Sequence, residues 1–354
     1  MPLSQREVMN AGELDSGPPG VREGLLCPEA MRLLAPIVLL GCCLLNPARG
    51  SAQAWMPLKG EGSVSITFQH VRSAGHFLED GSQFPGYETR ASNVSFDVAY
   101  GVTERLALDA SLPYMNTKYA GKEAPMFPDA VLDDGRYHGS LQDWRFGFRY
   151  NALERPFAAT PFFAAVIPSH SYGTIGEAAA GRGLREYTAG VYMGRLLHPV
   201  LRKAYVHGMY SYSFVEKVLD IGLNRSNVDA QIGYLITPSV SLSFLWRRVW
   251  THGGLDFGQL YTAPSDVFGN FDRVTRQNFQ HIGAGAELPL GESASVHLNV
   301  VKFVSGVNAH YGMGVAAGVS WSFQTRRGSL ISTAGQPPVR YAGLLKEGVS
   351  GSHQ

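Results

Sequence analysis

The chain lacks the strong positive charge of nucleic-acid-binding proteins and the many cysteines of disulfide-rich secreted proteins. Its formal net charge is only +1 over 354 residues, so it has no strong electrostatic attraction for nucleic acid. Its three cysteines, Cys27, Cys42 and Cys43, all lie within the first 43 residues. The remaining chain therefore has no cysteine pair for a disulfide or a zinc site.

Common catalytic and cofactor motifs are also missing. The sequence has no G-x-S-x-G, no Walker-type phosphate loop, no dinucleotide fingerprint and no H-E-x-x-H. Its histidines are scattered, without a recognisable ligand spacing. We therefore expect no enzyme activity, no cofactor and no metal.

Long apolar runs are equally scarce. The single continuous one, Leu33–Leu45, is too short to cross a bilayer as a helix, which takes about 20 residues. It follows Arg32 and is followed by the small-x-small ending Ala52–Ala54, the pattern of a secretory signal peptide. We predict a signal peptide at 31–54, cleaved after Ala54. A lipoprotein signal ending at Cys42 is an alternative, although apolar sequence continues beyond that cysteine.

Outside this segment, the domain prediction is simple. Residues 1–30 are interpreted as an upstream extension or a misassigned start. Residues 55–323 are predicted to form one folded domain. Residues 324–354, which are rich in Gly, Ser and Pro, are predicted to be a disordered periplasmic tail.

What the sequence does contain is a repeated alternation of apolar and polar residues. Between Gly62 and Phe323 it breaks into about twelve runs with apolar side chains at every second position, the pattern of half-exposed strands. Short and long connections alternate between the runs, as in outer-membrane barrels with short periplasmic turns and long external loops. The apolar positions fall at 64–68, 94–100, 106–114, 144–150, 161–167, 187–193, 206–212, 228–234, 240–246, 282–288, 294–300 and 315–323.

We predict an all-β fold, a closed antiparallel up-and-down transmembrane β-barrel of about 12 strands. The apolar faces carry no Asp, Glu, Lys or Arg, as lipid exposure requires, because a midplane Arg or Lys costs about 2–4 kcal/mol. A secreted soluble β-sandwich would show the same alternation and is the alternative. Aromatic residues at one predicted end favour the barrel, because they form an interfacial girdle: Tyr100, Tyr150, Tyr234, Trp321 and Phe323.

Several short motifs resemble a known family. They are AWMPLKGEGSVS at Ala54–Ser65, YGVTERL at Tyr100–Leu106, DWRFGFRY at Asp143–Tyr150 and AVIP at Ala165–Pro168. Together they resemble the MetA-pathway-of-phenol-degradation family of outer-membrane β-barrel transporters, over most of Trp55–Phe323. The resemblance implies small, often apolar or aromatic cargo. That family usually continues the last motif with Thr-Gly, where this chain has Ser169-His170.

The polar faces suggest a charged lumen. Centring the first hairpin on GVTER places Asp97 opposite Asp109, with Arg149 at the same height and Arg145 and Asp143 above. Two facing carboxylates repel, and an Arg fork can neutralise them through paired hydrogen bonds. The cluster is either a structural tie across the wall or a pore constriction.

A second polar group is expected across the barrel. Centring the next turns on LITPS and PLGES sets Asn227 opposite Arg247, Glu287 opposite Ser295, and Gly285 opposite His297. Gly312, Gly314 and Gly318 on the last strand would leave room for at least a narrow channel. The lumen or constriction candidates are Asp97, Asp109, Asp143, Arg145, Arg149, Asp229, Arg247, Glu287, His297 and Asn299.

The predicted function is an outer-membrane channel for passive passage of small solutes, in a Gram-negative type envelope. One alternative is a structural or adhesive barrel whose lumen is blocked, because the loop aromatics Phe257, Tyr261, Phe268 and Phe271 could fold inward. Another is an outer-membrane lipid hydrolase that uses Ser295 and His297. The expected partners are outer-membrane lipid, a small-molecule solute, and the barrel-assembly machinery, which would bind the final strand ending in Trp321 and Phe323; nucleic acid is not expected.

Overall fold

The computed structural model describes residues 56–121, 130–237, 240–291, 293–326 and 329–331. The predicted signal peptide, the upstream extension and most of the predicted tail lie outside these ranges and stay predictions.

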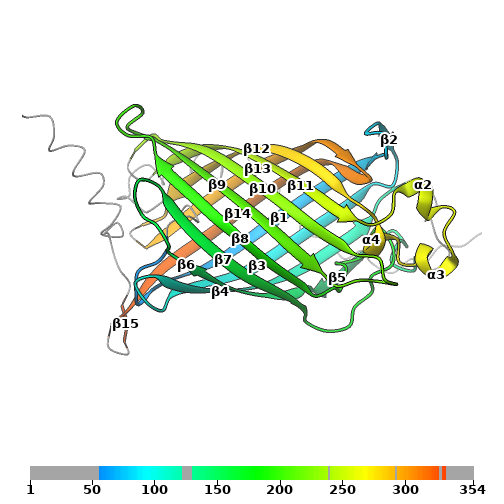
Figure 1. Cartoon of the computed structure of the whole chain (residues 1–354), viewed down its shortest axis with the longest axis horizontal. Helices are drawn as coiled ribbons and strands as arrows, with labels where there is room; N and C mark the ends of the chain where they lie inside the picture. The colour runs from blue at the N-terminus through cyan, green and yellow to red at the C-terminus, as the bar shows by residue number, and fades with distance from the viewer. Residues whose placement is uncertain (1–55, 122–129, 238–239, 292, 327–328, 332–354) are drawn as a thin grey trace, which may run out of the picture. The chain divides into compact units, whose positions relative to one another are not determined.

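These residues form a closed antiparallel barrel of twelve strands, which confirms the predicted fold (Figure 1). Each barrel strand pairs with the next along the chain, and β14 returns to pair with β1 from Glu61–Gln324 to Phe77–Ala309. Closure gives each of the twelve described barrel strands a hydrogen-bonded neighbour on both sides. The barrel strands are β1 (Glu61–Phe77), β3 (Thr89–Gly101), β4 (Leu106–Tyr119), β6 (Asp143–Tyr150), β7 (Ala158–Pro168), β8 (Glu186–Leu196), β9 (Ala204–Val215), β10 (Leu223–Leu235), β11 (Ser241–Gly253), β12 (Asn278–Pro289), β13 (Ala294–Val307) and β14 (Ala309–Arg326).

Short strands and helices lie at the two ends of the barrel. Short strands β2 (Gln83–Pro85) and β5 (Tyr137–Leu141) pair with β1 and β4, and β15 (Ser329–Ile331) pairs with β14. Three one-turn helices, α2 (Phe257–Leu260), α3 (Ser265–Phe268) and α4 (Phe271–Val274), lie in the connection between β11 and β12. No helix within the described ranges is long and apolar enough to span a membrane.

The apolar face of the strands is the outer face. On β6, Trp144, Phe146 and Phe148 are 40%, 47% and 45% exposed, and they alternate with half-buried Arg145 and Arg149. Among the residues of the predicted girdle, Tyr150, Tyr234 and Trp321 are 43%, 52% and 44% exposed, and Tyr100 stacks against Phe323 with ring centroids 6.4 Å apart. The alternation therefore predicted the two faces correctly, as expected where inward and outward residues alternate along every barrel strand.

The predicted hairpin registers are wrong. Asp97 pairs with Ser111, and Asp109 pairs with Ala99, so the two carboxylates do not face each other. In the β10–β11 and β12–β13 hairpins, each residue likewise pairs with a residue two positions later than predicted. Their observed pairs are Asn227–Val249 and Asp229–Arg247 on β10–β11, and Gly285–Asn299, Glu287–His297 and Pro289–Ser295 on β12–β13.

The cause is the position of each turn. The N–H groups of Val102, Ile236 and Leu290 donate to the carbonyls of Leu106, Val240 and Ala294 at 2.8, 2.9 and 2.8 Å. In the first two turns a threonine hydroxyl also accepts the closing N–H: Thr103 from Leu106 and Thr237 from Val240, both at 3.0 Å. Each loop is thus centred one residue later than predicted. When the centre of a turn moves by one residue, each strand residue pairs with a partner two positions away. Side chains alternate with a period of two, so every side chain keeps its face.

All long connections gather at one end of the barrel, which we call the loop end (Figure 1). Several of them contribute to one buried apolar group among the described residues, which we call the mouth cluster. Its members come from the connections β4–β6, β7–β8, β9–β10 and β11–β12 and from the adjoining ends of β9 and β10, so these loops pack against one another. The mouth cluster consists of Ala130, Leu184, Val215, Val218, Leu223, Phe257, Leu260, Phe271 and Val274.

Candidate functional site

The barrel interior carries the charged residues, and several of them form ion pairs. Arg149 Nη2 on β6 lies 2.7 Å from Asp109 Oδ1 on β4, and Arg225 on β10 pairs with Glu186 on β8. These side chains extend from polar faces whose opposite sides carry exposed aromatics. The lumen is therefore lined by charges of both signs.

The Arg149–Asp109 ion pair is largely buried against the inner face of the barrel wall. The two side chains are only 11% and 20% exposed. Gly147 lies opposite Asp109 on β6, and a Cβ atom there would be 3.0 Å from Asp109 Oδ2. The glycine thus provides the space in which the carboxylate lies.

Asp97 and Asp143 do not join this pair, which corrects the predicted cluster. Asp97 accepts a hydrogen bond of 2.8 Å from the hydroxyl of Ser95. Asp143 accepts one of 2.6 Å from Tyr172 in the connection between β7 and β8. Arg145 pairs in register with Ser111 and Val166 on the strands that flank β6. The carboxylates separate because Asp97 is two pairing positions away from Asp109 in the observed register.

Asp229 and Arg247 are direct cross-strand partners on β10 and β11, with Arg247 Nε 3.2 Å from Asp229 Oδ1. Although both face inward, their side chains retain 43% exposure for Arg247 and 33% for Asp229. Solvent-accessible space therefore exists inside the barrel at this level. Asn227, predicted to face Arg247, lies one lumen position away and donates to Ser211 at 3.3 Å.

The third polar group lies on β12 and β13. The hydroxyl of Ser295 donates to Glu287 at 3.2 Å, while His297 Nε2 lies 3.1 Å from Thr67 Oγ1 on β1. The two residues of the hydrolase alternative thus contact different partners, and this arrangement does not pair a serine nucleophile with a histidine base. Asn299 lies opposite Gly285.

Inward glycines accommodate neighbouring side chains. The imidazole of His297 lies over Gly318, the ring of Tyr205 over Gly233, and the ring of Phe162 over Gly190, where a Cβ atom would be 2.6 Å from the Phe162 ring. Rings laid over cross-strand glycines lie against the wall.

The predicted vacant space beside the last-strand glycines is therefore taken up. His297 covers Gly318, Val301 and Val71 flank Gly314, and the backbone of Arg72 approaches Gly312. These glycines permit close packing at the seam between β14 and β1.

Sequence reasoning missed an aromatic patch on the inner wall. Phe162 stacks on Tyr192 with ring centroids 4.5 Å apart, and Tyr192 stacks on His207 at 5.8 Å, beside Met209. The segment 161–167 is apolar on both faces, so its alternation gave no direction. The neighbouring strand β6 has a clear outward face that includes Phe148, and Phe148 pairs with Phe163. Aligning the segment with β6 would therefore have placed Phe163 outward and Phe162 inward.

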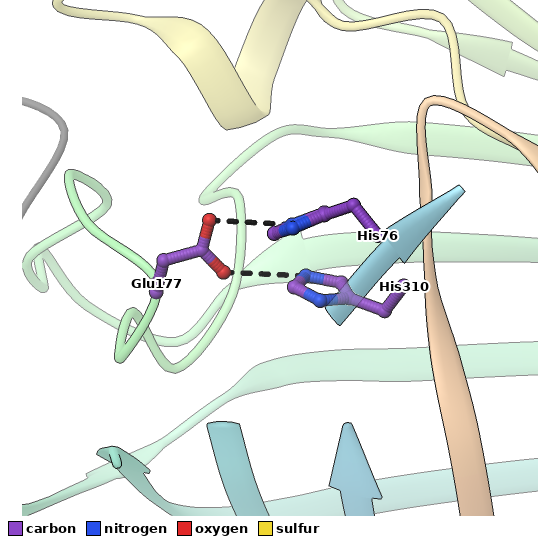
Figure 2. A group of neighbouring side chains, drawn as sticks. All are labelled: His76, Glu177 and His310. Atoms are coloured by element: carbon purple, nitrogen blue, oxygen red, sulfur yellow. Dashed lines mark ion pairs between the residues drawn. The ribbon is translucent and has the colours of Figure 1, made fainter. Parts of the chain in front are cut away.

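Sequence reasoning also missed a cluster at the loop end, formed by His76, Glu177 and His310 (Figure 2). These residues are far apart in the chain, so their spacing carries no signal.

Comparison with known proteins establishes the fold. No family profile matches the sequence, and no curated protein matches it. The COG4313 outer membrane channel from Pseudomonas putida F1 is similar in structure, with a TM-score of 0.61 and 11% identity over 78% of this chain and 100% of that chain. The NanC porin has a TM-score of 0.44 and 10% identity over 73% of this chain and 98% of that chain. At 11% identity the first likeness shows the fold alone: this chain has the architecture of outer-membrane β-barrels.

Proposed function

We propose that the protein is an outer-membrane channel through which small solutes pass passively. The observation that carries this proposal is the exposure of Arg247 and Asp229 inside the barrel. A lumen filled by side chains, as in barrels of eight strands, would bury such residues, whereas wider barrels leave water inside. The outward apolar face supports insertion into lipid, where only a closed barrel satisfies its backbone hydrogen bonds.

The inner wall suits solutes that combine an apolar ring with polar groups. Phe162 and Tyr192 form a stacked aromatic surface, and Arg149, the cross-strand partner of Phe162, forms its ion pair with Asp109 on the same wall. This mixture supports small aromatic solutes that carry polar groups, within the class that the sequence resemblance implies.

One observation favours the second candidate, a structural or adhesive barrel with a blocked lumen. The mouth cluster buries Phe257, Leu260 and Phe271 to 7%, 0% and 4% exposure among loops from several sides of the barrel. We propose that these loops gate the channel. The two functions differ in whether solutes cross once the loops are shortened.

The test uses purified full-length protein in planar bilayers and in liposomes loaded with an uncharged aromatic solute or a sugar. We expect conductance and solute release that increase when residues 256–274 are replaced by a short Gly-Ser linker. If neither protein conducts or releases solute, the channel proposal is wrong and the blocked barrel stands. Heat-modifiable gel migration shows in each case that the barrel has folded.

Two neighbouring arginines provide a matched pair of variants. Arg247 faces the lumen, whereas Arg248 faces outward and lies 4.7 Å from the ring of Trp250. We expect Arg247→Ala to change the ratio of cation to anion permeability and Arg248→Ala to leave it unchanged. Equal permeability ratios in wild type and both variants would contradict conduction past Arg247.

A further inference from the structure

A compact group of three potential ligands lies at the loop end. His76 on β1 and His310 on β14 are direct cross-strand partners, with ring centroids 4.4 Å apart. Glu177 reaches them from residues 169–185, the connection between β7 and β8 (Figure 2). Its Oε1 lies 3.4 Å from His76 Nε2, and its Oε2 lies 3.5 Å from His310 Nε2.

These distances are long for hydrogen bonds, because charge-assisted N–H···O bonds are about 2.7–2.9 Å. They fit two ligands of one metal ion. Zinc binds histidine nitrogen and carboxylate oxygen at about 2.0–2.2 Å, so two ligand atoms at a tetrahedral angle lie about 3.3–3.5 Å apart. The donor atoms of all three residues lie within 4.8 Å of one another.

Hydrogen bonding around His310 indicates which nitrogen carries its proton. The hydroxyl of Ser73 donates to the carbonyl of Gly75 at 3.1 Å and also lies 3.1 Å from His310 Nδ1. A hydroxyl has one hydrogen to donate, so when Ser73 donates to Gly75 the contact with His310 is made by an Nδ1–H donor. In the neutral imidazole, Nε2 then presents its lone pair toward Glu177. This is the orientation that outer-shell partners impose on metal-binding histidines.

The Glu177 carboxylate is buried, and its two oxygens approach the two histidines. Its side chain is 7% exposed, and among the described residues its buried Oε2 has no hydrogen-bond partner. A lone pair of His310 and a carboxylate oxygen thus face each other, an arrangement that a cation between them would stabilise.

The surroundings hold these ligands in place. Asp133 accepts the backbone N–H groups of Glu177 and Ala178 at 3.1 and 2.9 Å, which fixes the chain on both sides of the carboxylate. The His76 ring packs edge-on against Phe257 of the mouth cluster at 5.7 Å. His310 retains 36% side-chain exposure, which leaves a side open for entry of an ion and for a water ligand.

We propose that His76, Glu177 and His310 form a binding site for a divalent transition metal ion of the zinc type, with water as the fourth ligand. Counting round the barrel from β1, β7 and β8 are the fifth and sixth of twelve strands. The loop that carries Glu177 therefore starts nearly opposite the seam between β14 and β1. A bound ion ties that loop across the mouth, and this second, gating role rests on the proposed channel function.

Metal binding is tested on untagged full-length protein, folded in detergent, by titration calorimetry with Zn²⁺ and by visible absorption with Co²⁺. We expect one equivalent of metal and the intense absorption of four-coordinate Co²⁺ in wild type. His310→Ala and Glu177→Gln should lower affinity at least about tenfold. Loss of an outer-shell partner alone already costs about 10–100-fold.

The matched control is His138→Ala. His138 also contacts a carboxylate, Asp134, at the same end, with Nε2–Oδ1 at 2.8 Å, but among the described residues it belongs to no group of three potential ligands. This variant should bind as wild type does. Absence of stoichiometric binding to folded wild-type protein would overturn the site, as would unchanged affinity in both ligand variants. Heat-modifiable migration shows that each variant is folded.

The gating role has a separate readout. Zn²⁺ should reduce conductance of wild-type protein at least about tenfold, a chelator should restore it, and His310→Ala should respond to neither. Zinc binding with unchanged conductance overturns the gating role and leaves the site. A protein that binds zinc but never conducts, even with its loops shortened, overturns the channel and not the metal site.

Discussion

Arg149 on β6 and Asp109 on β4 form an ion pair of 2.7 Å inside the barrel, with little access to solvent. A charge in such a place is tolerated because its partner is present, and removing one partner leaves the other buried and uncompensated. The pair therefore links the stability of the wall to the charge of the lumen.

Arg149→Ala should lower the free energy of unfolding by on the order of 3 kcal/mol, because the Asp109 carboxylate loses its counter-charge. Urea titration of the folded protein in liposomes measures this. The double variant Arg149→Ala/Asp109→Asn should recover part of the loss. Asp97→Asn is the control, because Asp97 bonds to Ser95 and not to Arg149. A single variant as stable as wild type would contradict this account.

The β3–β4 register can be tested by oxidative cross-linking, in protein without the three native cysteines. Asp97→Cys with Ser111→Cys should form a disulfide readily, because directly paired residues have Cβ atoms about 4.5–5.5 Å apart. Asp97→Cys with Asp109→Cys should not, because diagonal partners are about 7–8 Å apart. The disulfide is detected by thiol titration of folded protein. Efficient formation in the second variant only would restore the register centred on GVTER.

Thr103→Ala should destabilise the β3–β4 hairpin by about 1 kcal/mol, because the Thr103 hydroxyl accepts the N–H groups of Arg105 and Leu106. Thr103→Ser keeps the hydroxyl and should retain most of the stability. Unfolding free energies in urea compare the three proteins. Equal losses in both variants would show that the methyl group, and not the hydroxyl, matters in this turn.

Phe271→Ala should loosen the mouth cluster without unfolding the barrel. Phe271 is 4% exposed and stacks on Phe257 at 5.3 Å, so its truncation leaves a cavity that costs about 3–5 kcal/mol. The loop 254–277 should then be cleaved faster in limited proteolysis, while gel migration stays that of a folded barrel. Tyr261→Ala, at a 58% exposed position of the same loop, is the control and should be cleaved at the wild-type rate.

The sequence predicted the strands and their faces because lipid and lumen impose a period of two on each strand. It could not predict register, because a change of two in the pairing preserves that period. Val102 and Ile236 illustrate the difficulty: both are apolar and would fit a strand, yet their N–H groups begin the turn.

The site could be predicted only in part, for a related reason. Asp109 and Arg149 lie on neighbouring strands, so local alternation and strand order placed them together. His76, Glu177 and His310 meet because the β7–β8 connection reaches the seam between β14 and β1. The path of such a loop produces no periodic pattern in the sequence.

Gly318 lies beneath the His297 imidazole on the inner wall. A single methyl group at this position, as in Gly318→Ala, would displace the ring toward the barrel axis. The distance that the His297 ring extends from the wall therefore depends on the missing side chain at residue 318. Alanine substitution of inward glycines should narrow the lumen, whereas alanine substitution of larger inward residues should widen it.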